Sequence, residues 1–277
     1  MRKIAIFLGI FFIAAPLFCS EKISDYAEQK ILQILNPYVV FGLKATEESP
    51  LQRLMAWEAE VEHDLPSAAI DLEQERLIFE SLFLMEKRHY QYDPKSPEMY
   101  KKLKEQFKKN DQWISEHEKE GINRWLYLFT GDMTSCYMMR SIPATLYYGL
   151  GVKRLYENAI KVDPSFAYGH INLGIWKYYA PGIFGGGAKK ALKHYEAAAK
   201  GAKTDKAKYI ANLYLSQYWF EKKDMEKCAE FLDKAEERSP GNKELALIRK
   251  VNTRGISLFE FNRSESGIDE NTDEEEE

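Results

Sequence analysis

The sequence predicts an all-α fold, an array of helical hairpins of the α-solenoid kind with a less regular helical part at the N-terminus. Apolar residues recur at helical spacing, whereas runs of alternating apolar and polar residues and Asn-Gly turns are missing from the sequence. Prolines divide the chain into segments of helix length. The C-terminal half also repeats itself, which predicts stacked copies of one helical unit.

The first 20 residues are typical of a secretory signal peptide. Arg2 and Lys3 precede an apolar run over Ile4–Phe18, and polar residues end that run before it reaches the length of about 20 residues that a spanning helix needs. We therefore expect residues 1–20 to be removed and the chain to be exported to a bacterial periplasm. Attachment of a lipid to Cys19 is the alternative, and it would hold the protein at the envelope.

Residues 21–121 are predicted to be helical, either as degenerate repeats or as a cap on the array. A broad apolar face runs through the segment 71–90. Ser96 and Pro97 have the order expected at a helix start, an N-cap followed by proline in the first turn, and that helix should extend to about Lys119.

Residues 122–254 contain repeated units that fit a 34-residue helix–turn–helix pattern. Small residues stand where the two helices cross closely, and large residues fill the gaps between them. The unit that starts at Tyr209 fits through Leu215 at position 7, Ser216 at 8, Trp219 at 11, Cys228 at 20, Leu232 at 24, Ala235 at 27 and Pro240 at 32. The unit from Ala167 fits through Leu173, Gly174, Ala191, Tyr195 and Ala198, with five extra residues in its turn.

An earlier unit is recognisable only by its second half. Tyr156, Ala159 and Pro164 fit positions 24, 27 and 32, but its first helix is expected to be irregular around Pro143. Residues 255–277 are expected to form an acidic, disordered tail, because eight acidic residues and no base stand at its end. The rest of the chain carries no basic excess, which argues against nucleic-acid binding.

This pattern resembles the tetratricopeptide repeat (TPR). The stretch 169–198, with a proline and a glycine run in a widened turn before a helix of the form Ala…Tyr-Glu-x-Ala, resembles a variant found in exported bacterial TPR proteins. Among these is the T-component family associated with TRAP-type transporters. The resemblance implies a helical repeat protein, lipid-anchored in that family, that assists a solute-binding protein.

The sequence shows no catalytic or metal-binding motif. Gly185, Gly186 and Gly187 are expected to form a structural turn, since Ala188-Lys189 does not complete a phosphate-binding loop. The five histidines lack metal-ligand spacing, and Cys136 has no local pattern of a nucleophile. No cofactor or metal is therefore predicted, and the chain is not expected to be an enzyme.

In TPR arrays, positions 2, 5, 9 and 12 of each first helix line a concave groove. In the two readable units these positions hold Tyr168, Ile171, Ile175 and Tyr178, then Ile210, Leu213, Gln217 and Phe220. Such an apolar and aromatic groove suits an amphipathic helix, an apolar peptide or a hydrophobic small molecule. The alternative is that a neighbouring helix or the C-terminal segment buries these side chains.

The sequence therefore predicts an exported, non-catalytic scaffold that binds another protein or peptide, with membrane contact only through the signal peptide or a lipid on Cys19. Two alternatives stay open. One is a transport accessory protein, similar to the T-component, that handles a hydrophobic solute in its groove. The other is an enzyme with an unrecognised site in residues 21–150. The oligomeric state is not predicted.

Overall fold

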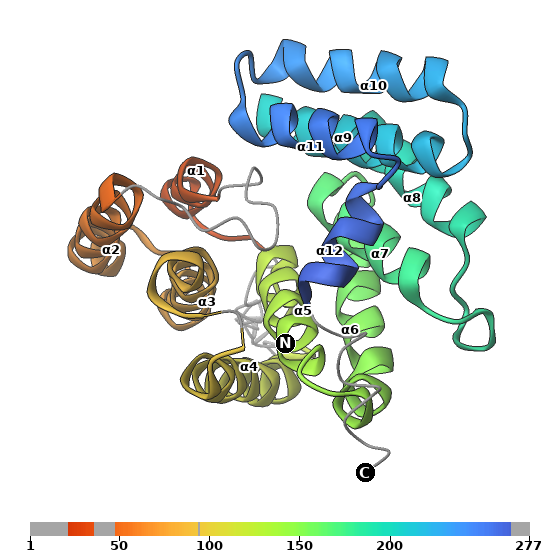
Figure 1. Cartoon of the computed structure of the whole chain (residues 1–277). Helices are drawn as coiled ribbons and strands as arrows, with labels where there is room; N and C mark the ends of the chain where they lie inside the picture. Colours follow the sequence, from red (N-terminus) through yellow and green to blue (C-terminus); the bar gives the residue numbers. More distant parts are fainter. Residues whose placement is uncertain (1–21, 36–47, 94, 267–277) are drawn as a thin grey trace, which may run out of the picture.

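The computed structural model describes residues 22–35, 48–93 and 95–266, and within these ranges the chain is helical and contains no strand (Figure 1). The all-α prediction is thereby confirmed. Helices in the described ranges are α1 (Asp25–Ile34), α2 (Glu48–Ala68), α3 (Leu72–Gln91), α4 (Pro97–His117), α5 (Arg124–Met138), α6 (Ile142–Val162), α7 (Ala167–Tyr179), the 3-10 turn η1 (Gly182–Phe184), α8 (Ala188–Gly201), α9 (Asp205–Glu221), α10 (Met225–Arg238), α11 (Lys243–Thr253) and α12 (Leu258–Ser266).

The predicted signal peptide, residues 1–20, lies outside the described residues. Among the helices that are described, none has both the length and the apolar character required to cross a bilayer.

The helix starts in the N-terminal region follow from the local sequence. Ser96 accepts a hydrogen bond from the backbone N–H of Met99, and Pro97 stands in the first turn of α4, as predicted. Asp71 caps α3 in the same way by accepting from the N–H of Gln74. Helices α1 to α4 pack side by side in chain order, and α3 and α4 then pack on α5 (Figure 1).

Three helix pairs follow, α5 with α6, α7 with α8, and α9 with α10, and each pair is packed closely. A Cβ atom at Gly131 would come within 2.6 Å of the Tyr156 ring, and one at Gly174 within 2.4 Å of the Tyr195 ring. The small residues expected at position 27 of each unit are fully buried, namely Ala159, Ala198 and Ala235. The small and large residues that define the repeat pattern therefore meet across the helix pairs.

The irregularity expected around Pro143 is a break between two helices. Helix α5 ends at Met138, and a new helix begins with Ser141 as its N-cap and Pro143 in its first turn. A proline is tolerated there because the first N–H groups of a helix have no intrahelical partner. The extra residues of this unit lie in the long helix α6.

The predicted disordered tail, residues 255–277, does not begin where the sequence suggested. Residues Leu258–Ser266 form α12, in which Leu258 and Phe259 are buried. This helix does not continue the row of hairpins but crosses the face of α7 (Figure 1). The remainder of the predicted tail, residues 267–277, lies outside the described residues.

The close helix crossing gives a first prediction. Gly174→Ala places a methyl group against the completely buried Tyr195 ring, so we expect the variant to lose about 2 kcal/mol of unfolding free energy. Its melting temperature should fall by about 4–8 °C in a thermal scan followed by circular dichroism.

The matched control is Gly151→Ala in α6, where a Cβ atom meets nothing within 4 Å. Alanine has the better helix propensity, so this variant should melt at or slightly above the wild-type temperature. Equal melting temperatures for Gly174→Ala and wild type would show that α7 and α8 do not cross at this glycine.

Candidate binding site on the concave face

The eight predicted groove positions divide into two groups. Ile175, Tyr178 and Ile210 are half-buried, and the other five are buried, namely Tyr168, Ile171, Leu213, Gln217 and Phe220. Phe220, for example, packs with Tyr209 and Leu232 in the core of the last hairpin. The five buried residues are therefore part of the core. This matches the alternative stated from the sequence, in which a neighbouring helix or the C-terminal segment buries these side chains.

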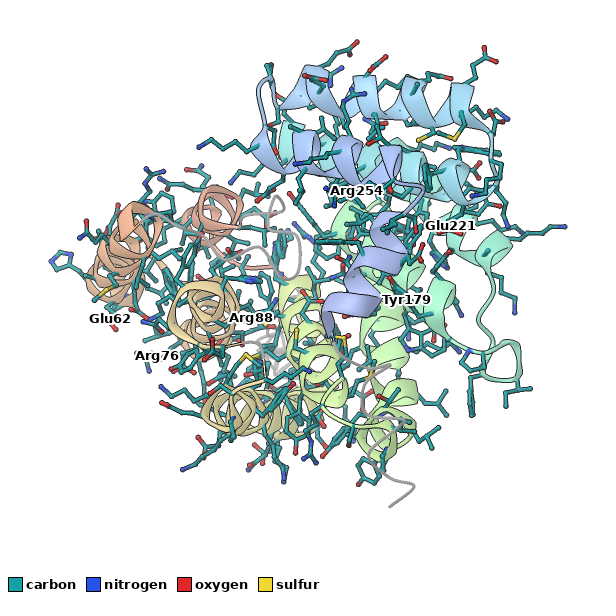
Figure 2. All side chains as sticks on the ribbon, in the orientation of Figure 1. Glu62, Arg76, Arg88, Tyr179, Glu221 and Arg254 are labelled. Carbon is teal, nitrogen blue, oxygen red and sulfur yellow. The ribbon has the colours of Figure 1, made fainter. Side chains whose placement is uncertain are left out.

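Helix α12 is the segment that covers this face. The Phe259 ring stacks on the Tyr178 ring with 3.9 Å between centroids. The Tyr179 hydroxyl donates a 2.7 Å hydrogen bond to the Phe259 carbonyl oxygen, and Figure 2 labels Tyr179 beside α12. The rings of Tyr195 and Tyr214 lie within 6.3 Å and 5.9 Å of Phe259. We call the four tyrosines around Phe259 the aromatic site.

Gln217 fixes the approach of this segment instead of facing a groove. Its Oε1 atom accepts hydrogen bonds from the Leu258 backbone N–H at 2.8 Å and from Asn252 Nδ2 at 3.0 Å. Its Nε2 atom donates to Asn252 Oδ1 at 3.0 Å. One buried amide therefore ties α9 to α11 and to the start of α12, and a buried polar group satisfied in this way costs little.

The aromatic site is uncharged at neutral pH. Burial, together with the negative charge of Glu221, raises the pKa of Tyr178 to about 12, and burial raises the pKa of Tyr195 well above its usual value. The Tyr195 hydroxyl is buried and has no hydrogen-bond partner among the described residues. The site thus offers aromatic faces and one unsatisfied hydroxyl, which suits an apolar segment with a polar atom near its aromatic anchor.

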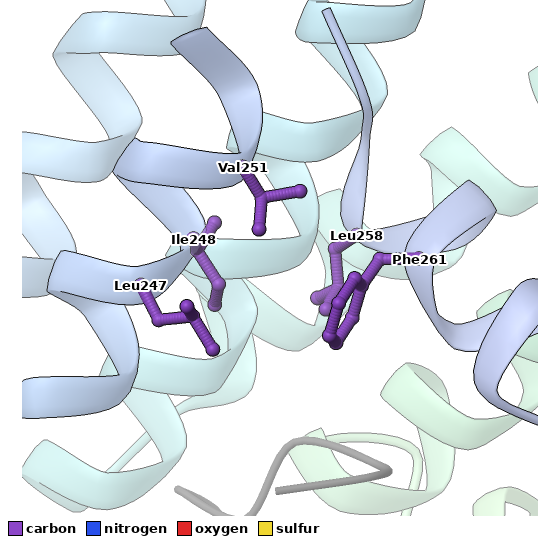
Figure 3. A pocket seen from close by; sticks show the side chains of 5 residues that line it. All are labelled: Leu247, Ile248, Val251, Leu258 and Phe261. Carbon is purple, nitrogen blue, oxygen red and sulfur yellow. The ribbon is translucent and has the colours of Figure 1, made fainter. Parts of the chain in front are cut away.

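Beside α12, a small apolar depression lies between α11 and the following segment. It is lined by Leu247, Ile248, Val251, Leu258 and Phe261 and has no enclosed space the size of a water molecule (Figure 3). It is the seam between two packed helices and offers no room for a ligand.

The three glycines of the loop form a turn. Gly185 and Gly187 have φ angles of 90° and 132°, and a Cβ atom at Gly186 would meet the Ala180 carbonyl oxygen at 1.8 Å. Their N–H groups donate to the carbonyl oxygens of Gly182, Pro181 and Lys177. The amides of these three glycines are therefore already used within the turn, as expected of a structural loop.

Asp132 is a residue that the sequence analysis missed. Its Oδ1 atom accepts hydrogen bonds from the Tyr156 hydroxyl at 2.9 Å and from Asn172 Nδ2 at 2.6 Å, which joins α5, α6 and α7. Burial raises the pKa of Asp132 to about 7, although both hydrogen bonds act to lower it. The available signal was that Asp132 is the one acidic residue of the apolar helix α5.

A carboxyl group that titrates near neutral pH can exchange protons with a ligand. Its neighbours do not complete a catalytic set, however. Burial raises the pKa of the Cys136 thiol, which keeps it protonated and unreactive. No group of three or more metal-ligating side chains gathers anywhere in the described part of the chain. Asp132 is thus a hydrogen-bond acceptor that joins three helices.

Two histidines meet between α7 and α8. His170 Nε2 lies 3.1 Å from the Pro164 carbonyl oxygen, which can only accept, so this nitrogen carries the proton and donates. His170 Nδ1 then accepts from His194 Nδ1 at 3.1 Å. Burial, and after it the charge of His170, lowers the pKa of His194 to about 4, so the His194 ring is neutral at pH 7 and its contact with His170 joins α7 to α8.

Comparison with known proteins gave no relative. No protein-family model matches the chain, and no significant match was found among curated proteins or solved structures.

The raised pKa of Asp132 predicts a pH dependence of stability. The native carboxyl group titrates at about 7 and the unfolded one at 3.8, so the native protein binds more protons between these values. Stability from this group is fully present below pH 3.8 and is lost as the pH rises through 7. Asp132→Asn keeps an oxygen for Tyr156 and Asn172, so its unfolding free energy relative to wild type should rise by about 4 kcal/mol from pH 4 to pH 8. Urea unfolding at several pH values measures this difference.

The control is Asp163→Asn, for which the opposite sign is expected. Burial acts to raise the pKa of Asp163, but hydrogen bonds from Ser165 outweigh it and lower the pKa below its usual value. This variant should lose stability at neutral pH and recover towards wild type in acid. A pH-independent difference for Asp132→Asn would contradict the raised pKa.

Proposed function

We propose that the protein is an exported, non-catalytic binding scaffold, a TPR-like solenoid of the bacterial periplasm that holds an apolar helical segment of a partner protein in its aromatic site. One observation carries the proposal. The aromatic site already receives a short helix with an aromatic anchor, α12 of the same chain, through Phe259. A surface that binds one such helix has the shape and chemistry to bind another.

The repeat register supports the solenoid part of this proposal. Gly131 and Gly174 stand at the same position of successive units, and each lies against the tyrosine expected at position 24, Tyr156 and Tyr195. The α9–α10 pair has Ser216 and Leu232 at the corresponding positions, and α7 contacts both α5 and α9, as a row of stacked pairs requires. The export part rests on the basic start and the apolar run of residues 1–20.

The contacts of α12 define what a partner segment must supply. Leu258 is 3% exposed and Phe259 is 2% exposed, so two adjacent apolar side chains give the contact its buried area. Gln217 recognises the N–H at the helix start, where the first amides of any helix lack partners, and Tyr179 recognises a carbonyl. A partner helix that begins with Leu-Phe satisfies the same groups.

Because α12 and a partner segment use the same groups, they compete. The local concentration of α12 is high, since a short loop ties it to α11. The unsatisfied Tyr195 hydroxyl favours the partner, because a buried hydroxyl without a partner costs about 1–3 kcal/mol, which a better matched segment recovers.

A synthetic peptide of residues 256–266 tests the proposal. Phe259→Ala in the full chain weakens the resident helix, and we expect this variant to bind the labelled peptide at least about tenfold more tightly than wild type, since the competitor is lost. Fluorescence anisotropy measures both affinities, and circular dichroism shows that the variant remains helical.

The control peptide carries alanine in place of Phe259 and should not bind either chain. A second control is the full-chain variant Met55→Ala, an exposed apolar residue on α2, which should bind the peptide as wild type does. Equal and negligible binding to wild type and to a folded Phe259→Ala chain would show that the aromatic site accepts no helix in trans.

A further inference from the structure

A second apolar surface lies on the outside of the array. Helix α6 exposes Leu146, Tyr147 and Leu150 at 66%, 80% and 54% of their surfaces, and Ile142 beside them is also exposed. No charged residue interrupts the stretch 141–152. The described helices pack on the opposite side of α6, where Ala144 and Val152 are buried.

The η1 turn adds to this surface. Ile183 is 87% exposed and Phe184 is 40% exposed, and the turn follows α7, which packs on α6 (Figure 1). We call these six residues, Ile142, Leu146, Tyr147, Leu150, Ile183 and Phe184, the outer apolar patch. Trp176 of α7, the helix that leads into η1, contacts α6, because its Nε1 atom donates to the Gly149 carbonyl oxygen at 2.9 Å.

Lysines fill the space between the two parts of the patch. Lys153 and Lys177 both lie over the Trp176 ring, with Nζ atoms 5.9 Å and 5.2 Å from its centroid, and Lys190 donates to the Gly185 carbonyl oxygen. Burial and then the charge of Lys153 lower the pKa of Lys177, and Lys190 acts in the same direction. Three ammonium groups therefore lie close together, with Glu157 as the nearby counter-charge.

The whole segment around the patch is basic. Residues 133–195 contain eight lysines and arginines but only two acidic residues, Glu157 and Asp163, in a chain whose formal net charge is −4. The basic residues of this segment are Arg140, Lys153, Arg154, Lys161, Lys177, Lys189, Lys190 and Lys193. The exposed aliphatic and aromatic side chains of the patch therefore belong to a segment with a net positive charge, in a chain whose overall net charge is negative.

We infer that the outer apolar patch docks on an anionic lipid surface. Exposed leucine, isoleucine and aromatic side chains enter the boundary between headgroups and acyl chains, while the surrounding lysines and arginines face anionic headgroups. Each of these cations contributes about 1 kcal/mol near an anionic surface, and the attraction weakens with salt. This contact is in addition to any that the N-terminal 20 residues make.

Charge decides between this surface and a second copy of the chain. In a two-fold dimer the same patch would meet itself, which would bring two clusters of lysines together. Like charges that face each other across an interface are destabilising, whereas an anionic membrane neutralises them. The electrostatics therefore favour lipid over self-association.

Vesicle flotation tests the inference with the chain lacking residues 1–20, because that apolar run would insert by itself; the described fold begins at Lys22. We expect binding to phosphatidylcholine vesicles with about 30% phosphatidylglycerol, little binding to pure phosphatidylcholine, and release as salt is raised. The triple variant Leu146→Ser, Tyr147→Ser and Ile183→Ser should bind at least about tenfold more weakly.

The matched control is Met55→Ser, Ile70→Ser and Met225→Ser, which removes three residues of similar exposure, 54%, 62% and 53%, from other parts of the surface. It should bind vesicles as the unmodified chain does. Absence of vesicle binding, or equal binding by the two triple variants, overturns the inference. So does a dimer in sedimentation that the patch variant alone dissociates, because the patch would then be a contact between copies.

Discussion

The close approach of paired helices is the constraint on which the rest of the structure depends. Helices α7 and α8 can cross as they do only because Gly174 leaves room for the Tyr195 ring, and α5 and α6 repeat this arrangement with Gly131 and Tyr156. When a tyrosine ring packs against a glycine of the partner helix, the contact determines both the distance between the two helices and their relative orientation. Helix α7 also contacts α5 and α9, and the aromatic site is built by tyrosines of α7, α8 and α9.

The array is also closed by polar contacts between segments far apart in sequence. Lys206 at the start of α9 donates to the carbonyl oxygens of Leu32, Gln33 and Leu35, which end α1 and have no partner within that helix. The positive charge at a helix C-terminus is favourable, and burial lowers the pKa of Lys206. In the same way Glu75 of α3 accepts from the Ser24 backbone N–H and hydroxyl. The Lys206 contact joins α1 to α9, and the Glu75 contact joins the segment before α1 to α3, so these helices are positioned without a repeat pattern of their own.

The sequence predicted what depends on local spacing and missed what depends on distant partners. The helical class, the cap at Ser96 and the small residues Gly174 and Ala198 follow from spacing along one helix or one hairpin. The burial of Gln217 could not be predicted, because its partners, Asn252 and the Leu258 N–H, come from elements that match no repeat. Helix α12 was missed for a related reason. Its nine residues lie next to an acidic end, and composition alone cannot show that two adjacent apolar residues find an aromatic site.

The aromatic site and the outer apolar patch have different surroundings, and this difference favours a different kind of partner for each. On the inner face, the Tyr178 and Tyr195 side chains are uncharged and Gln217 offers a fixed hydrogen-bond acceptor, so the recognition proposed there depends on the shape and backbone of one helix. On the outer face of α6, Leu146 and Tyr147 are exposed, and the segment of sequence that carries them is basic. A surface of this second kind selects its partner by charge and apolar character alone. An anionic lipid surface has both properties and needs no fixed hydrogen-bonding geometry. The two proposals are therefore compatible, because a protein segment at the aromatic site and a membrane at the outer apolar patch would use different residues.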